Sequence, residues 1–236
     1  MLTIIIRNED FISENNVEIT QKKDINHVKN VYRYKTGDTI RLIDGKYEYK
    51  AIITEIENKR IQLRITEKNE DKYSLKTELD IALGILKNDK MNIALQKLTE
   101  IGINRIIPLK TDRVVVKLEG SKEKWNTVTE EALKQCRGIK IPEIDKILTL
   151  KDINFSDYDK VLFAYENSEE NKPVFTLLSG EEKRVLYLVG PEGGFTEEET
   201  LYIKEQGAME ISLGKRIYRA ETAAIVIGGI VADVYK

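Results

Sequence analysis

The pattern of hydrophobic and polar positions changes its period after residue 72. In residues 1–72, apolar and polar residues nearly alternate in short runs at 2–6, 38–43, 47–55 and 60–67. Such runs are typical of half-buried strands, and the Asp44-Gly45 pair is a strong hairpin signal. The polar segment 67–72 predicts a linker. We therefore predict a first domain, residues 1–72, that is a small β-barrel or meander.

From residue 73 to residue 236, the chain alternates between strands and helices. The pattern predicts strands at 79–85, 106–109, 144–147, 160–164, 185–189 and 210–213, and helices at 89–101, 121–136, 197–206 and from about 221. This order predicts an α/β domain with a parallel sheet. The last helix has almost no polar face over 223–232, so its own domain or a second subunit must cover it.

Two glycine-containing loops in this second domain are the best candidates for a ligand site. The first, residues 190–195 (GPEGGF), leads from a strand into a helix that starts with a capping box between Thr196 and Glu199. The second, residues 212–219 (SLGKRIYR), precedes the last helix. Glycines let backbone amides approach a ligand. The spacings match neither GxGxxG nor the phosphate-binding loop, so dinucleotide and ATP sites are disfavoured. The two loops predict one composite site.

Composition narrows the class of protein. The 236 residues are 41% hydrophobic, which is enough for a real core. One cysteine and one histidine exclude an internal disulfide and metal sites built from clusters of either residue. No apolar run approaches the roughly 20 residues that span a bilayer, and the N-terminus lacks the features of a signal peptide. We expect a cytoplasmic protein that binds neither metal nor membrane.

The sequences of the two loops resemble those of one protein family. Residues 190–195, followed by Leu213-Gly214 and residues 219–223 (RAETA), match the paired signature of the RsmE family of 16S ribosomal RNA uracil-N3 methyltransferases. Chain length and element order match over nearly all of the sequence. The resemblance implies an α/β protein: an N-terminal PUA-like β-barrel plus a C-terminal SPOUT α/β domain with a trefoil knot. It also implies a homodimer that acts on 16S rRNA in the small ribosomal subunit.

The family's cofactor is S-adenosyl-L-methionine, and the resemblance implies that it binds between the two loops. The residues implied in cofactor binding are Leu188, Gly190, Pro191, Glu192, Gly193, Gly194, Leu213, Gly214, Ile217, Tyr218, Arg219, Thr222 and Ala223. Backbone groups and apolar walls can recognise an adenine ring without charged side chains.

Two residues at the mouth of the second loop are implied in catalysis. Methylation of uracil N3 requires removal of the imide proton and stabilisation of the anion on the uracil oxygens. Arg219 suits the stabilising role, because a guanidinium stays protonated and cannot act as a base. We assign the base to Glu221. Outside the family context, the same pair would be an exposed ion pair and a favourable helix start.

Five residues are candidates for contact with RNA. They are His27, Arg33, Lys90, Lys97 and Arg113. Lys97 also lies three residues before Glu100, where the two can form a stabilising ion pair on one helical face. The net charge of −2 shows no global basic field, so RNA must bind a local patch.

One segment departs from the family pattern. Members commonly carry Glu-Gln in the helix predicted at 121–136, where this chain has Lys134-Gln135, and the following arginine, Arg137, is displaced by one position. The reversal weakens any transfer of detailed contacts to this helix.

Two other functions fit the sequence. A non-catalytic RNA-binding dimer would use the barrel and keep the second domain for assembly, and it would not retain S-adenosylmethionine. A small-molecule enzyme using the same cofactor would not need residues 1–72.

Overall fold

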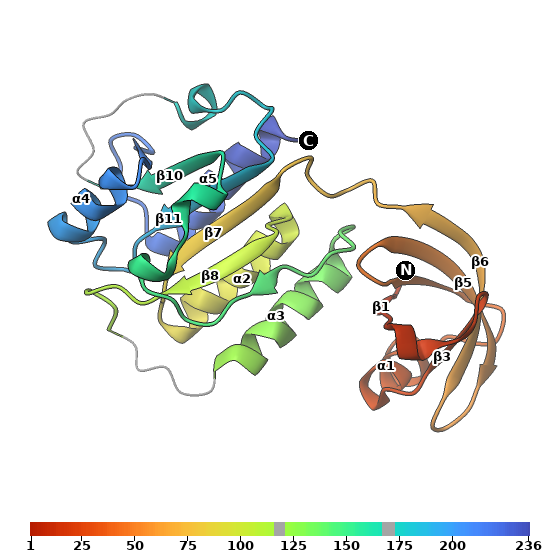
Figure 1. Cartoon of the computed structure of the whole chain (residues 1–236). Helices are drawn as coiled ribbons and strands as arrows, with labels where there is room; N and C mark the ends of the chain where they lie inside the picture. The colour runs from red at the N-terminus through yellow and green to blue at the C-terminus, as the bar shows by residue number, and fades with distance from the viewer. Residues whose placement is uncertain (116–120, 167–172) are drawn as a thin grey trace. The chain divides into compact units, whose positions relative to one another are not determined.

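The computed structural model describes residues 1–115, 121–166 and 173–236. The chain forms two compact units, Met1–Ser74 with Leu133–Lys140, and Leu75–Ala132 with Ile141–Lys236 (Figure 1). The predicted boundary at 72 lies close to the first division. Segment 133–140 belongs to the first unit, whereas the pattern assigned it to the second domain.

The first unit is built on one six-stranded sheet with the order β1-β4-β5-β6-β3-β2. Its strands are β1 (Thr3–Ile5), β2 (Phe11–Ser13), β3 (Asn16–Ile19), β4 (Thr39–Ile43), β5 (Tyr47–Ile56) and β6 (Ile61–Glu70). Neighbouring strands are antiparallel except β1 and β4, which run parallel. The short 3-10 turn Asn8–Asp10, the helix α1 (Lys22–Asn26) and a π-helical turn (His27–Val31) complete the unit.

The hairpin at Asp44-Gly45 is confirmed, because it joins the antiparallel strands β4 and β5 and Gly45 has a φ of 88°. The linker prediction is wrong for residues 67–70, which continue β6 and pair with β5. Polar side chains fit this stretch because it is mostly exposed. The Lys68 ammonium, for example, lies 3.9 Å from the centroid of the Tyr47 ring.

The segment that departs from the family pattern belongs to the core of the first unit. Leu133 and Ile139 pack with Ile43 in a small apolar cluster. The Lys134 ammonium lies 3.0 Å from the Asp24 carboxylate, and both side chains are buried. Arg41 donates a hydrogen bond of 2.8 Å to the Arg137 carbonyl oxygen. The reversed charge of Lys134 is thus compensated within this chain by Asp24.

The second unit contains a six-stranded sheet with the order β12-β10-β11-β7-β8-β9, and all of its pairs are parallel. The strands are β7 (Glu78–Gly84), β8 (Arg105–Leu109), β9 (Glu143–Ile144), β10 (Lys160–Ala164), β11 (Arg184–Val189) and β12 (Met209–Ile211). The helices are α2 (Asn88–Ile101), α3 (Ser121–Gln135), α4 (Glu197–Glu205) and α5 (Ala220–Val234). The predicted alternation of strands and helices is confirmed, as is the α/β fold class.

The differences from the pattern are short elements. The strand predicted at 144–147 is reduced to β9 and an isolated bridge between Leu109 and Leu148. Single 3-10 turns occur at Leu150–Asp152, Phe155–Asp157 and Val174–Leu177. Such turns bury too few residues to produce a hydrophobic period.

Helices α2 and α5 share one apolar core with the sheet of the second unit. Tyr187 on β11 fixes α5 in place: its hydroxyl donates a hydrogen bond of 3.0 Å to the Ala224 carbonyl oxygen. A side chain at Gly228 would collide with that hydroxyl. Ile227 is fully buried on this face. The opposite face of α5, with Ile225, Val226 and Ile230, is only partly covered.

The described residues contain no helix that is long and apolar enough to cross a membrane. In the same part of the chain, no three His, Cys, Asp or Glu side chains are grouped as a metal site would need.

Candidate functional site

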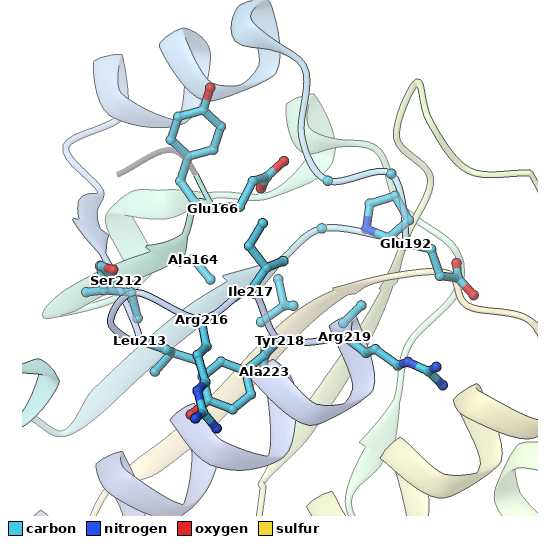
Figure 2. A pocket seen from close by; sticks show the side chains of 18 of the residues that line it. Ala164, Glu166, Glu192, Ser212, Leu213, Arg216, Ile217, Tyr218, Arg219 and Ala223 are labelled. Carbon is cyan, nitrogen blue, oxygen red and sulfur yellow. The ribbon is translucent and has the colours of Figure 1, made fainter. Parts of the chain in front are cut away.

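A cavity of about 600 Å³ lies in the second unit, where three neighbouring strands end. Loops at the carboxyl ends of parallel strands meet at one edge of the sheet, which is where α/β proteins bind ligands. The wall is formed by residues 164–166, 189–194 and 211–220, together with Lys90 and Ala223. Figure 2 shows Glu166 on one side of the cavity and Arg216 and Tyr218 on the other. Both loops line this one cavity.

The first loop, residues 190–194, is held by close contacts with the protein's own backbone. A Cβ atom on Gly190 would lie 2.9 Å from the Gly194 carbonyl carbon. A Cβ atom on Gly84, at the end of β7, would lie 2.6 Å from Cδ of Pro191 and closer still to its nitrogen. Real Cβ atoms do not approach this closely, so both positions require glycine for packing within the protein.

Arg113 braces the same loop from outside. Its guanidinium donates hydrogen bonds to the carbonyl oxygens of Gly193, at 2.8 Å, and Phe195, at 3.3 Å. Its side chain lies so close to Gly193 that a Cβ atom there would be 3.0 Å from Cβ of Arg113. Arg113 therefore holds the shape of the loop.

Glu192 and the start of α4 add further contacts. Glu192 accepts a hydrogen bond from the Lys87 N–H at 3.3 Å and lies 3.4 Å from the Lys90 ammonium. Burial would raise the pKa of Glu192, but the hydrogen bonds and the charge of Lys90 outweigh it and hold the pKa below its ordinary value. The predicted capping box of Thr196 and Glu199 is confirmed by reciprocal hydrogen bonds of 2.9 and 3.1 Å.

The second loop, residues 212–219, has few contacts of its own. Gly214 has a φ of 95°, and a Cβ atom there would meet nothing within 4 Å. The Gly214 N–H donates to the Ser212 hydroxyl at 3.2 Å. Ile217 is 82% exposed and Tyr218 is 40% exposed. Within the described residues, the Arg219 guanidinium has no hydrogen bond or ion pair, and it lines the cavity immediately before α5.

Most residues predicted to bind the cofactor line this cavity. Leu188 does not, because it is fully buried in the core beneath the loop, and Thr222 lies on α5 outside the lining. The pattern missed Ala164, Tyr165, Glu166, Val189, Ile211, Ser212, Lys215, Arg216 and Ala220, and it gave Lys90 another role. Residues 164–166 could have been found from topology, because β10 lies between β11 and β12.

The two predicted catalytic residues differ in position. Arg219 lines the cavity, whereas Glu221 is 9% exposed and does not. Among the described residues, Oε2 of Glu221 has no hydrogen-bond partner.

The five predicted RNA contacts are divided between the two units. His27 and Arg33 belong to the first unit, where Arg33 is exposed and has a φ of 54°. Lys97 forms the predicted ion pair with Glu100 at 2.9 Å. Lys90 lines the cavity, and Arg113 braces the first loop.

Comparisons with known proteins agree with this geometry. The RNA methyltransferase domain matches residues 73–232, and the RNA methyltransferase PUA domain matches residues 19–66. The ribosomal RNA small subunit methyltransferase E of Rickettsia conorii is 33% identical, with 91% of this chain and 88% of the relative covered. The protein of the same name from Bacillus subtilis is 30% identical over 86% of this chain and 84% of its own length.

Solved structures share the fold over almost the whole chain. The ribosomal RNA small subunit methyltransferase E of Neisseria gonorrhoeae, bound to S-adenosyl methionine, has a TM-score of 0.87 at 23% identity and covers 100% of this chain and 98% of its own. A Legionella pneumophila protein in complex with the same cofactor has a TM-score of 0.84 at 26% identity, with coverages of 99% and 98%. Domain matches, relatives and fold together place this chain in the RNA methyltransferase family that includes the ribosomal RNA small subunit methyltransferases E.

Proposed function

We propose that this protein transfers a methyl group from S-adenosylmethionine to N3 of a uridine in 16S rRNA of the small ribosomal subunit. The observation that carries the proposal is the relative named ribosomal RNA small subunit methyltransferase E, which is 33% identical over 91% of this chain. The cavity between the two loops supports it, because most residues of the family signature line that cavity.

The cavity suits this cofactor chemically. Val189, Ile211, Leu213 and Ala223 provide apolar surface for an adenine ring, and the two loops offer backbone donors and acceptors to its edge. When bound, S-adenosylmethionine supplies an electrophilic methyl group on its sulfonium. The protein's task is then to orient the two reactants and to stabilise charge on the uracil.

Arg219 is the residue that we assign to charge stabilisation. It lines the cavity and no described residue pairs with its guanidinium, so its hydrogen-bond donors are available to the uracil oxygens as N3 loses its proton. Glu221 does not line the cavity, which argues for a different role from that of a base. We assign acceptance of the proton to water, and we assign Glu221 to the start of α5, where an acidic residue is favourable.

Recognition of the RNA is assigned to a local surface. The PUA-like barrel of the first unit, with His27 and Arg33, supplies part of it. With a net charge of −2, the protein has a weak non-specific attraction to phosphates, so the assembled small subunit should be a better substrate than free RNA. The uridine must be unpaired or flipped out, because N3 is hidden in a base pair.

We also propose that two copies associate through the outer face of α5. A groove there is lined by Phe175, Ile225, Val226, Gly229, Ile230, Asp233 and Val234, and Phe175 is 58% exposed. Apolar surface of this kind is typical of interaction sites. The test is Ile230→Lys, which places a charge in this groove and should give monomers. Ile227 is not suitable for the test, because Ile227→Lys would bury a charge and unfold the protein. The trefoil knot remains a prediction from the family, and the cytoplasmic location remains a prediction from the sequence.

Nucleoside mass spectrometry tests the proposed reaction. Small subunits from cells that lack this gene should gain 3-methyluridine in 16S rRNA when purified protein and S-adenosylmethionine are added. Retention of labelled cofactor without methyl transfer would contradict the choice of substrate. Absence of cofactor binding would favour the non-catalytic RNA-binding dimer. Methylation of naked 16S RNA at an equal or faster rate would remove the preference for the assembled subunit.

A further inference from the structure

The proposed reaction leaves one charged side chain of the cavity without a task. Glu166 lies two residues after the end of β10 and lines the cavity. Its side chain is exposed, and within residues 1–115, 121–166 and 173–236 it forms no hydrogen bond or ion pair. Figure 2 shows its carboxylate on the side of the cavity opposite Arg216 and Tyr218.

The other carboxylate of the wall is already engaged. Glu192 accepts a hydrogen bond from the Lys87 N–H and lies beside the Lys90 ammonium. The remaining charged residues of the wall are cations: Lys215, Arg216 and Arg219. Among the described residues that line the cavity, Glu166 is therefore the acidic side chain that is available to a ligand.

The first loop makes room for this carboxylate. A Cβ atom on Gly194 would lie 2.9 Å from Oε2 of Glu166 and 3.0 Å from its Cδ. Gly194 also has a φ of 68°, which a residue with a side chain adopts at a cost. The carboxylate thus lies against the backbone of the loop, at a place where any other residue at 194 would push it away.

A carboxylate accepts hydrogen bonds and donates none, so its ligand must bring donors. The apolar residues of the cavity suit the adenine of S-adenosylmethionine, which leaves the ribose hydroxyls and the α-ammonium as its polar donors. Carboxylates bind ribose hydroxyls in other nucleotide sites. We propose that Glu166 accepts hydrogen bonds from these donors and so holds the polar part of the cofactor. This inference rests on the proposed cofactor.

Calorimetric titration tests the assignment and separates the two donors. S-adenosylhomocysteine carries both the ribose and the ammonium, whereas methylthioadenosine carries the ribose alone. Glu166→Ala should weaken S-adenosylhomocysteine binding about tenfold to a hundredfold, the usual effect of losing hydrogen bonds to a charged group. A similar loss with methylthioadenosine assigns the ribose. A loss confined to S-adenosylhomocysteine assigns the ammonium.

The controls keep the two proposals apart. Glu198→Gln removes an exposed carboxylate outside the cavity and should leave both affinities unchanged. Glu166→Gln keeps the shape of the side chain and provides the measurement if Glu166→Ala does not fold. If wild-type protein binds both ligands and neither Glu166 variant binds more weakly, the assignment of Glu166 is overturned and the cofactor proposal stands. If wild-type protein binds neither ligand, the cofactor proposal itself is overturned.

Discussion

The two loops that form the cavity are built in opposite ways. Residues 190–194 are fixed by contacts with Gly84, Arg113 and Lys90, and their glycines leave space for the loop's own backbone, for Arg113 and for Glu166. Residues 212–219 have few internal contacts and expose Ile217 and Tyr218. The first loop is thus shaped before any ligand arrives, whereas the second presents free side chains. The difference suggests that the first loop determines cofactor affinity and the second supplies groups that act on the uridine.

Arg219→Ala should produce the largest effect and is the sharpest test of this comparison. Loss of the guanidinium removes stabilisation of the developing uracil anion, so turnover should fall about a hundredfold to a thousandfold, as it does when an oxyanion donor is lost. Cofactor affinity should change far less. Single-turnover methylation should be measured beside a calorimetric titration. If turnover falls only in proportion to cofactor binding, Arg219 binds the cofactor. The two loops would then not have the separate roles described above.

Glu221→Gln separates the proposed structural role of Glu221 from the role of a base. A base would lose activity that partly returns at high pH, when uracil ionises unaided. Its position outside the cavity lining predicts instead that turnover stays near the wild-type value and keeps the wild-type pH profile. A rate profile from neutral to alkaline pH decides between them.

Gly190→Val compares the packing of the two loops directly. The new side chain would meet the backbone of Gly194, so S-adenosylhomocysteine binding should weaken tenfold or more, about 1.4 kcal/mol, and thermal stability should also fall. Gly214→Ala is the matched variant in the second loop. A Cβ atom at 214 has open space but an unfavourable φ, so the smaller effect should be backbone strain alone. Equal effects on binding would show that the loops are equally constrained.

Arg113→Ala should have a smaller effect on cofactor affinity. Two hydrogen bonds to loop carbonyls are lost, but their donor is partly exposed, so we expect about a fivefold to tenfold weaker affinity. Arg113→Lys should recover part of the loss through one donor. Lys97→Ala removes an equal charge from an exposed ion pair and should change affinity little. If Arg113 instead acts only on RNA, its removal should leave cofactor titrations unchanged and weaken RNA binding.

The long elements could be predicted from the sequence because each has a clear hydrophobic period. The parallel strands β7, β8, β10 and β11 and the helices α2, α4 and α5 lie close to their predicted positions. The turn region 22–31 was missed, because α1 and the π-helical turn that follows it are each only five residues long. The strand β6 was cut short for another reason: its last residues are polar because they are exposed.

The site was predictable where the sequence carries a motif. The glycines of the first loop marked its position, but the reason given for them was incomplete. In the structure, Gly190 allows close packing of the loop backbone, Gly193 leaves space for the Arg113 side chain, and Gly194 leaves space for the Glu166 carboxylate. Glu166 itself has no motif around it, because its place in the cavity depends on the order of strands in the sheet. Spacing along one sequence does not contain that information.

The first unit is built from two separate segments of the chain, and this limits which truncated proteins can be used to test its role. A fragment of residues 1–74 would lack segment 133–140, so Ile43 would lose Leu133 and Ile139, and the buried Asp24 would lose Lys134. Deleting residues 1–72 would in turn expose Leu133 and Ile139 to water. Either truncated protein would misfold locally, and its inactivity would say nothing about whether the barrel is needed for the substrate. Point substitutions at exposed positions such as Arg33 can answer that question, because they leave the shared core intact.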